Sequence, residues 1–258
     1  MSTAVLESHL SSRDVETRPS LLRLTAVELR KMVDTRAGFW LLLSIFGLTV
    51  AALVTAYFAG GAEDHTFEQM FVLAAFPSAL LLPIVGILLV SSEWSNRTTL
   101  ITFTLVPRRA RVLAAKVGAG VVLASIALVI ALGLAALGAA IAQPDVDGAW
   151  SISPQLFGQL TLYVIASMLM GVAFGAGLLS SPVAIVLYFL MPMGAIAVSA
   201  IPWFDGVVPW LDWWSSVSIL ADNPLSSTEW AHAGTSLAAW VLLPLIVGLW
   251  RITRSEVS

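Results

Sequence analysis

Residues 117–142 read VGAGVVLASIALVIALGLAALGAAIA and contain no charged side chain. A helix needs about 20 apolar residues to cross the hydrocarbon core of a bilayer, so this stretch alone is long enough to span a membrane. Apolar runs that could cross a bilayer cover residues 38–58, 69–91, 112–142, 155–179, 182–201 and 231–250. We therefore predict an all-α, polytopic membrane protein with six transmembrane helices.

The composition of the whole chain agrees with this prediction. Of the 258 residues, 58% are hydrophobic and 11% are charged, whereas soluble domains carry about 25% charged residues. A soluble enzyme is thus nearly excluded, and six spans leave little room for a second domain. Cysteine is absent, which excludes disulfides and thiolate metal sites. His9, His65 and His232 do not have the spacing of a metal-ligand motif.

The placement of the charges predicts the orientation in the membrane. All 13 basic residues lie in three segments, residues 1–36, 97–116 and 251–254, while the polar gaps elsewhere carry Asp and Glu. Basic loops stay on the cytoplasmic side of a membrane. The three basic segments and both termini are therefore expected in the cytoplasm, and six crossings return the chain to that side.

The connection at residues 179–182 is the least certain of the expected boundaries, because it is short and uncharged. We interpret it as a tight hairpin between spans four and five. A single long helix kinked at this point is the alternative, but it would place Arg251 and Arg254 outside. Residues 1–19 lack an apolar core, so we expect a disordered cytoplasmic tail rather than a signal peptide. Residues 20–258 then form a single transmembrane domain.

Small residues and prolines within the spans predict how the helices pack. Two sets of small residues recur at intervals of four: Ala131, Ala135 and Ala139, and Ser167, Gly171 and Gly175. Such spacing allows close helix contacts in lipid, and packing within the chain is favoured over a subunit interface. Three prolines, Pro77, Pro83 and Pro192, should kink their helices, as hinges or as fixed shape.

Residues 20–37 are predicted to form an amphipathic elbow helix that leads straight into the first span. At 100° per residue its apolar face contains Leu22, Ala26, Leu29, Met32 and Val33. Its polar face contains Arg23, Arg30, Lys31 and Asp34. A helix of this kind is expected to lie in the headgroup plane, with its basic side chains on anionic lipid.

Residues 92–111 form the long internal cytoplasmic loop of this interpretation. A helix-compatible piece from Trp94 to Leu105 is followed by Pro107 and by a basic cluster. Its apolar side chains need cover, which a cytoplasmic partner or the end of the bundle would supply. Residues 202–230 are expected outside. They are rich in tryptophan, which prefers the membrane interface, so they lie on or re-enter the outer interface or else cap a substrate exit.

The sequence contains no internal source of energy for transport. A phosphate loop needs lysine followed by Ser or Thr, and the two lysines of the chain precede Met32 and Val117. The interiors of the expected spans contain no Asp, Glu, His, Lys or Arg for a proton path or an intramembrane protease, and Glu93 and Lys116 lie at cytoplasmic ends. The chain is therefore predicted not to be an enzyme, and any transport would draw its energy from another subunit.

Several motifs resemble the permease subunit of type-2 ATP-binding-cassette (ABC) exporters. They are Glu28, Lys31 and Arg36 in the elbow segment, then Glu93-Trp94, Arg97-Thr98, and Leu105-Val106-Pro107-Arg108-Arg109 with Arg111 and Lys116. The C-terminal residues from Pro244 to Val257 resemble the actinobacterial members of this family. The resemblance covers nearly the whole chain.

The resemblance implies a membrane domain that pairs with a second copy, identical or not, and with two cytoplasmic ATPase subunits in a bacterial cell membrane. ATP and Mg²⁺ would be bound by the ATPases, and this chain would bind no cofactor, metal or nucleic acid. The loop between spans two and three would be the coupling helix. Its ATPase-coupling residues would be Glu93, Trp94, Arg97, Thr98, Phe103, Pro107, Arg108, Arg109 and Arg111. Asn96 and the β-branched residues after it are poor helix formers, which favours a shorter coupling element.

Charge-free spans favour an apolar or amphipathic substrate, such as a drug, lipid or peptide. For the substrate path we nominate Thr49, Ser78, Gln159, Ser167 and Met168. The alternative to an exporter is a membrane scaffold, anchor or immunity-type protein that does not transport and whose loop binds another cytoplasmic partner.

Overall fold

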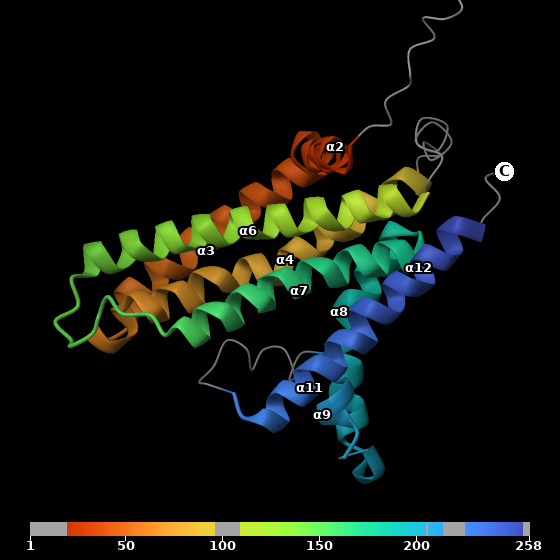
Figure 1. The fold of residues 1–258 in the computed structure, drawn as a ribbon. Coiled ribbons are helices and arrows are strands. Elements are labelled where there is room, and N and C mark those ends of the chain that lie inside the picture. Colours follow the sequence, from red (N-terminus) through yellow and green to blue (C-terminus); the bar gives the residue numbers. More distant parts are fainter. Residues whose placement is uncertain (1–19, 96–108, 205, 214–224, 255–258) are drawn as a thin grey trace, which may run out of the picture.

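A computed structural model describes residues 20–95, 109–204, 206–213 and 225–254, and all regular structure in these ranges is helical (Figure 1). The α-helices are α2 (Leu21–Asp34), α3 (Arg36–Ala59), α4 (Phe67–Ser95), α6 (Arg109–Ala142), α7 (Pro154–Leu178), α8 (Ser181–Ser199), α9 (Val208–Leu211), α11 (Ser227–Leu237) and α12 (Leu243–Arg254). Two 3₁₀ turns, η1 (Ala62–His65) and η2 (Pro202–Phe204), occupy connections, and a π-helical turn, η4 (Ala238–Leu242), joins α11 to α12. The expected tail and most of the expected coupling loop lie outside the described residues.

Five helices are long and apolar enough to cross a membrane. They are Arg36–Ala59, Phe67–Glu93, Arg109–Ala142, Pro154–Leu178 and the continuous helix Ser227–Thr253. Their number and composition indicate a multi-pass membrane protein. The remaining expected span falls on α8, whose fully described apolar part, Ser181–Met191, is shorter than the other five.

The helix ends follow the local sequence chemistry. Ser226 and Glu229 form the expected capping box at the start of α11, with the Ser226 backbone N–H donating to Glu229 Oε2 at 2.7 Å. The helix α7 ends at Leu178, and Leu179 adopts a left-handed conformation with φ of 56°. Because α8 then begins at Ser181, a turn separates two helices here, and the alternative of one kinked helix is wrong.

The centre of the bundle is the contact between α4 and α7. A Cβ atom added to Gly171 would lie 2.5 Å from the Cα of Pro83, and closer still to its carbonyl oxygen. A Cβ atom on Gly175 would lie 2.8 Å from the carbonyl oxygen of Ile87. The small residues of α7 therefore serve packing within the chain, as expected, because they let two helix backbones touch. The alanines at 131, 135 and 139 are likewise buried.

Pro77 and Pro83 both lie within α4. The carbonyl three residues before each proline accepts a hydrogen bond from a neighbouring helix. Thr49 Oγ1 donates to Ala74 O at 3.4 Å, and Tyr188 Oη donates to Leu80 O at 3.0 Å. Side chains of α3 and α8 thus satisfy carbonyls of the proline-containing helix, as an apolar environment demands.

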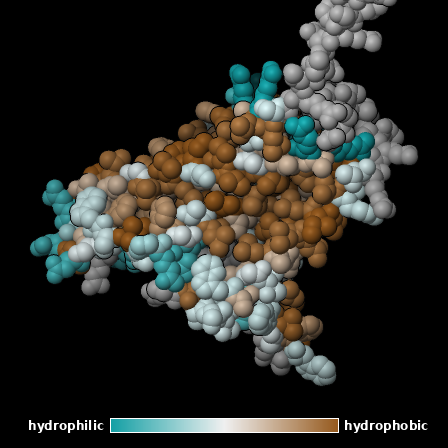
Figure 2. All heavy atoms as spheres, in the orientation of Figure 1, coloured by the Kyte–Doolittle hydropathy of each residue, from teal (hydrophilic) through white to brown (hydrophobic). Residues whose placement is uncertain are grey.

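The surface of the bundle is apolar along its length and polar at its ends (Figure 2). Large hydrophobic side chains point outward from the long helices, among them Phe58 on α3 and Val129 and Ile141 on α6, which are 81%, 69% and 69% exposed. Apolar exposure on this scale is unfavourable in water but is expected where lipid is the solvent.

Candidate functional site

Four charged side chains from three helices meet at one end of the bundle. Lys31 of α2 lies 2.7 Å from Glu28 and 2.8 Å from Glu93 of α4. Lys116 of α6 lies 2.7 Å from Glu28 and 3.0 Å from Glu93. Each carboxylate therefore contacts both ammonium groups. We call this set of four residues the ionic junction.

Lys116 and Glu28 are almost completely buried, at 3% and 5% exposure. The Lys116 ammonium also donates to the carbonyl oxygen of Leu89 at 3.0 Å. With Glu28, Glu93 and Leu89 it has three oxygen partners, which matches its three N–H donors. Two positive and two negative charges balance, so the junction holds ionic groups inside the protein without excess charge.

Lys31 lies at the open side of the ionic junction, with 41% of its side chain exposed. Burial lowers the pKa of Lys31, but the hydrogen bonds and the negative charges of Glu28 and Glu93 outweigh it, so the pKa is raised above the usual value. Lys31 is therefore protonated throughout the physiological pH range.

The helix α2 packs a mixed polar and apolar face against the bundle. Glu28 and Met32 are its buried residues, whereas Leu22 is 83% exposed. Lys31, expected on the polar outer face, reaches inward to Glu93. One residue separates α2 from the first span: Thr35 ends α2 in an extended conformation and then caps α3.

The ionic junction lies at the base of the expected coupling loop. Glu93 is in the last turn of α4 and Lys116 is near the start of α6, so the junction joins the two helices that flank residues 96–108. The expected coupling residues Arg97, Thr98, Phe103, Pro107 and Arg108 lie outside the described residues. Trp94 is placed in the last turn of α4 and Arg111 in the first turn of α6.

The C-terminal helix reaches this same end of the molecule. Arg109 Nη1, at the start of α6, donates to the carbonyl oxygen of Ile252 at 2.7 Å. Arg251 Nη1 donates to Gly177 O near the end of α7. The described parts of all three basic segments are therefore gathered at one end of the bundle, which we call the basic end (Figure 1).

The other nominated residues are distributed over the bundle. Arg36 is the first residue of α3 and is exposed. Each of the nominated substrate-path residues is buried within this single chain: Thr49, Ser78, Gln159, Ser167 and Met168. Thr49 and Ser78 line an otherwise apolar cavity of about 240 Å³ between α3, α4 and α6. Gln159 is 1% exposed, and its amide has no hydrogen-bond partner among the described residues.

Lys116 belongs to the site, although it is absent from the coupling residues expected from the sequence. The sequence offers a signal for Lys116, because it is one of two lysines in the chain. The structure places both lysines in the ionic junction. A lysine inside an apolar run needs a buried counter-charge, and the glutamates at 28 and 93 are among the acidic residues expected at the same end.

No protein-family model and no curated protein matches this chain. Among the described residues, no three His, Cys, Asp or Glu side chains gather as a metal site. The fold and the site thus define a helical, multi-pass membrane protein with a buried ionic junction at its basic end.

Proposed function

We propose that this chain is the membrane-spanning permease subunit of an ATP-driven ABC exporter. The observation that supports this proposal best is the ionic junction, which ties α2 to both helices that flank the basic loop. In the proposed assembly two copies of the permease pair and each loop contacts a cytoplasmic ATPase subunit, which binds ATP and Mg²⁺. The substrate is apolar or amphipathic.

The geometry suggests how a movement of the loop would reach the spans. Buried ion pairs are costly to separate, because each partner would leave an uncompensated charge in a medium of low polarity. Glu28, Glu93 and Lys116 therefore favour movement of α2, α4 and α6 as one unit. A displacement of residues 96–108 by the ATPase would move this unit, and the close contact between α4 and α7 would carry the movement to α7.

The proposed topology has six spans, with α8 as the fifth and the basic end in the cytoplasm. Labelling of single cysteines tests it directly, because the chain contains no cysteine. In intact cells a membrane-impermeant maleimide should label Asp147→Cys and Gly206→Cys, and should label Asp34→Cys only after permeabilisation. All three positions are exposed. Labelling of Gly206→Cys only from the inside would show that α8 does not cross.

The coupling proposal predicts separate effects for the loop and for the ionic junction. Replacing residues 97–106 by a Gly/Ser linker should abolish the complex with a co-expressed ABC ATPase subunit that binds the native chain. Glu93→Gln should keep the complex, because the loop is intact, but should lower substrate-stimulated ATP hydrolysis severalfold. Pull-down from detergent and ATPase assays on the purified complex measure the two effects.

Asp34→Asn is the matched control, since Asp34 is an exposed carboxylate on α2 whose partner is Arg30, outside the junction. It should leave both complex and hydrolysis unchanged. A loop replacement that keeps full coupling would overturn the exporter proposal. A chain that purifies from its native membrane with a partner lacking a nucleotide site would favour the scaffold alternative.

A further inference from the structure

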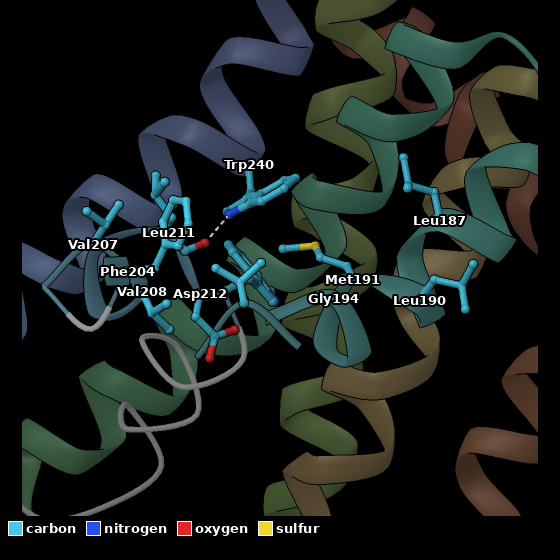
Figure 3. A pocket seen from close by; sticks show the side chains of 12 residues that line it. Leu187, Leu190, Met191, Gly194, Phe204, Val207, Val208, Leu211, Asp212 and Trp240 are labelled. Atoms are coloured by element: carbon cyan, nitrogen blue, oxygen red, sulfur yellow. Dashed lines mark hydrogen bonds between the residues drawn. The ribbon is translucent and has the colours of Figure 1, made fainter. Parts of the chain in front are cut away.

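Two apolar cavities of the bundle differ in the charges near them. The larger, of about 430 Å³, lies between α8, α9 and η4, where Trp240 Nε1 donates to the carbonyl oxygen of Leu211 (Figure 3). These elements fall within residues 117–250, which contain no lysine or arginine. The smaller, of about 240 Å³, lies between α3, α4 and α6 and is bordered by α2, which carries basic side chains. We call it the α3–α6 cavity.

The α3–α6 cavity opens toward the lipid. Phe46 of α3 and Ile126 and Ile130 of α6 line it and are 47%, 45% and 47% exposed. Thr49 and Ser78 lie at its closed side, at 3% and 2% exposure. An empty space between apolar walls loses van der Waals contacts, so acyl chains from the surrounding bilayer would fill it. The volume is below the range of roughly 300–1,000 Å³ for small-molecule sites, which suits a segment of one chain.

The helix α2 borders the α3–α6 cavity at the end toward the ionic junction. Leu29 and Val33 of α2 are lining residues. Figure 1 shows α2 almost end-on, whereas α6 runs across the view, so α2 crosses the bundle instead of following it. A helix that crosses the spans in this way lies in the plane of the lipid headgroups. The cavity therefore extends from the hydrocarbon region to the level of the headgroups.

Arg36 places a positive charge at this level. It is exposed, follows the cavity-lining Val33 by three residues and is the first residue of α3, which forms one wall. Arg30 has Asp34 as its partner at 2.9 Å, whereas Arg36 forms no ion pair among the described residues. A guanidinium group can donate two parallel hydrogen bonds to a phosphate. Arg36 can therefore hold the phosphate of a lipid whose chain lies in the cavity.

The net charge of this surface favours an anionic headgroup. The exposed charged residues of α2 and of the start of α3 carry three positive charges and one negative: Arg23, Arg30, Asp34 and Arg36. A zwitterionic headgroup carries an ammonium group beside its phosphate, and this surface repels that group. Basic side chains at the headgroup level attract anionic lipids for the same reason.

We propose that the α3–α6 cavity binds one anionic phospholipid, with an acyl chain between α3 and α6 and the phosphate on Arg36. The inference goes beyond the proposed transport function, because the binding needs this chain alone. It also goes beyond a general attraction of α2 to anionic membranes, because it assigns one lipid to one position.

Native mass spectrometry of the delipidated full-length chain in detergent tests the proposal. Dioleoylphosphatidylglycerol and dioleoylphosphatidylcholine have the same acyl chains and differ in headgroup charge. One phosphatidylglycerol should bind saturably per chain, about fivefold more tightly than phosphatidylcholine. Arg36→Gln should remove this preference, because the charge is lost and the cavity is kept. Ala127→Phe should weaken the binding of both lipids, because Ala127 lines the cavity and the ring would fill it.

Arg23→Gln and Val129→Phe are the matched controls. Arg23 is an exposed arginine near the other end of α2, and Val129 of α6 is 69% exposed and is not a lining residue. Both variants should bind the two lipids like the native chain. If Ala127→Phe unfolds, the preference for phosphatidylglycerol in Arg36→Gln remains informative, because it compares two lipids on one variant.

Three results would overturn the proposal. Equal affinity of the native chain for the two lipids would show that charge does not select the lipid. An equal loss of preference in Arg23→Gln and Arg36→Gln would show a general attraction without a site. Dimers that form only as the lipid leaves would assign the α3–α6 cavity to contact with a second copy. None of these results depends on an ATPase, so the exporter proposal is tested separately.

Discussion

Lys116→Met is expected to lower the free energy of unfolding by about 3–5 kcal/mol, a larger loss than the removal of an exposed charge would cause. The substitution fills a similar volume but removes the ammonium group that contacts Glu28 and Glu93. Because Glu28 is 5% exposed, its carboxylate keeps only Lys31 as a partner in a buried position. Unfolding in mixed micelles, followed by circular dichroism, measures the loss.

Arg30→Ala is the control for this prediction. Arg30 forms an ion pair with Asp34 at 2.9 Å on the same end of the molecule, but the two side chains are 82% and 60% exposed. Exposed pairs contribute about 0–1 kcal/mol, because water screens the charges. A Lys116→Met variant no less stable than Arg30→Ala would show that the ionic junction does not hold α2 to the bundle.

A double variant distinguishes two costs of Lys116→Met. One is the Glu28 carboxylate left without its lysine partner, and the other is the lost packing of the lysine side chain. In Glu28→Gln/Lys116→Met one lysine and one glutamate are removed together, so Lys31 and Glu93 remain as a neutral pair. The double variant should be less destabilised than the sum of the two single variants. The difference is the interaction energy between the two sites.

Five of the six expected spans and their ends could be predicted from the sequence, because they depend on local properties. Runs of about 20 apolar residues predict which segments form helices in lipid. The capping box at Ser226 determines where α11 starts, because it depends only on residues within one helical turn. The turn at Leu179 is also predictable, on the argument that the basic C-terminus must return to its starting side. The structure places Ile252 next to Arg109 at that end.

The orientation of α2 could not be predicted in the same way. A helical wheel ranks faces by hydrophobicity, and on that scale Glu28 and Lys31 belong outside. Their inward orientation depends on Glu93 and Lys116, which are 62 and 88 residues away from their partners in the sequence. The gain from pairing buried charges across helices is a tertiary effect, which overrides the local pattern.

The ionic junction and the cavity beside Trp240 lie in regions of opposite chemical character. The ionic junction contains balanced charges and links the ends of three helices, which suits a part that transmits movement. The cavity of about 430 Å³ beside Trp240 is apolar, and one of its walls is the short helix α9, whose Leu211 carbonyl accepts from Trp240 Nε1. The helix α7 lies between the ionic junction and the cavity. Its close packing on α4 therefore determines whether a movement at the junction is transmitted to the cavity.

Gly171→Ala is expected to disrupt this central contact and to lower the free energy of unfolding by at least about 3 kcal/mol. The added methyl group would lie 2.5 Å from Pro83 Cα. The clash is with backbone, so no side-chain rotation relieves it and α4 and α7 must move apart. Unfolding in mixed micelles measures the loss, and the ionic junction should loosen because Glu93 lies on α4.

Gly158→Ala on the same helix provides the control. An added Cβ at Gly158 meets nothing within 4 Å, so this change should shift stability by less than about 1 kcal/mol, since alanine favours a helix over glycine. The two variants differ only in position along α7. Equal stabilities would mean that α7 tolerates a wider separation from α4, and the close backbone contact would then not be what holds the bundle together.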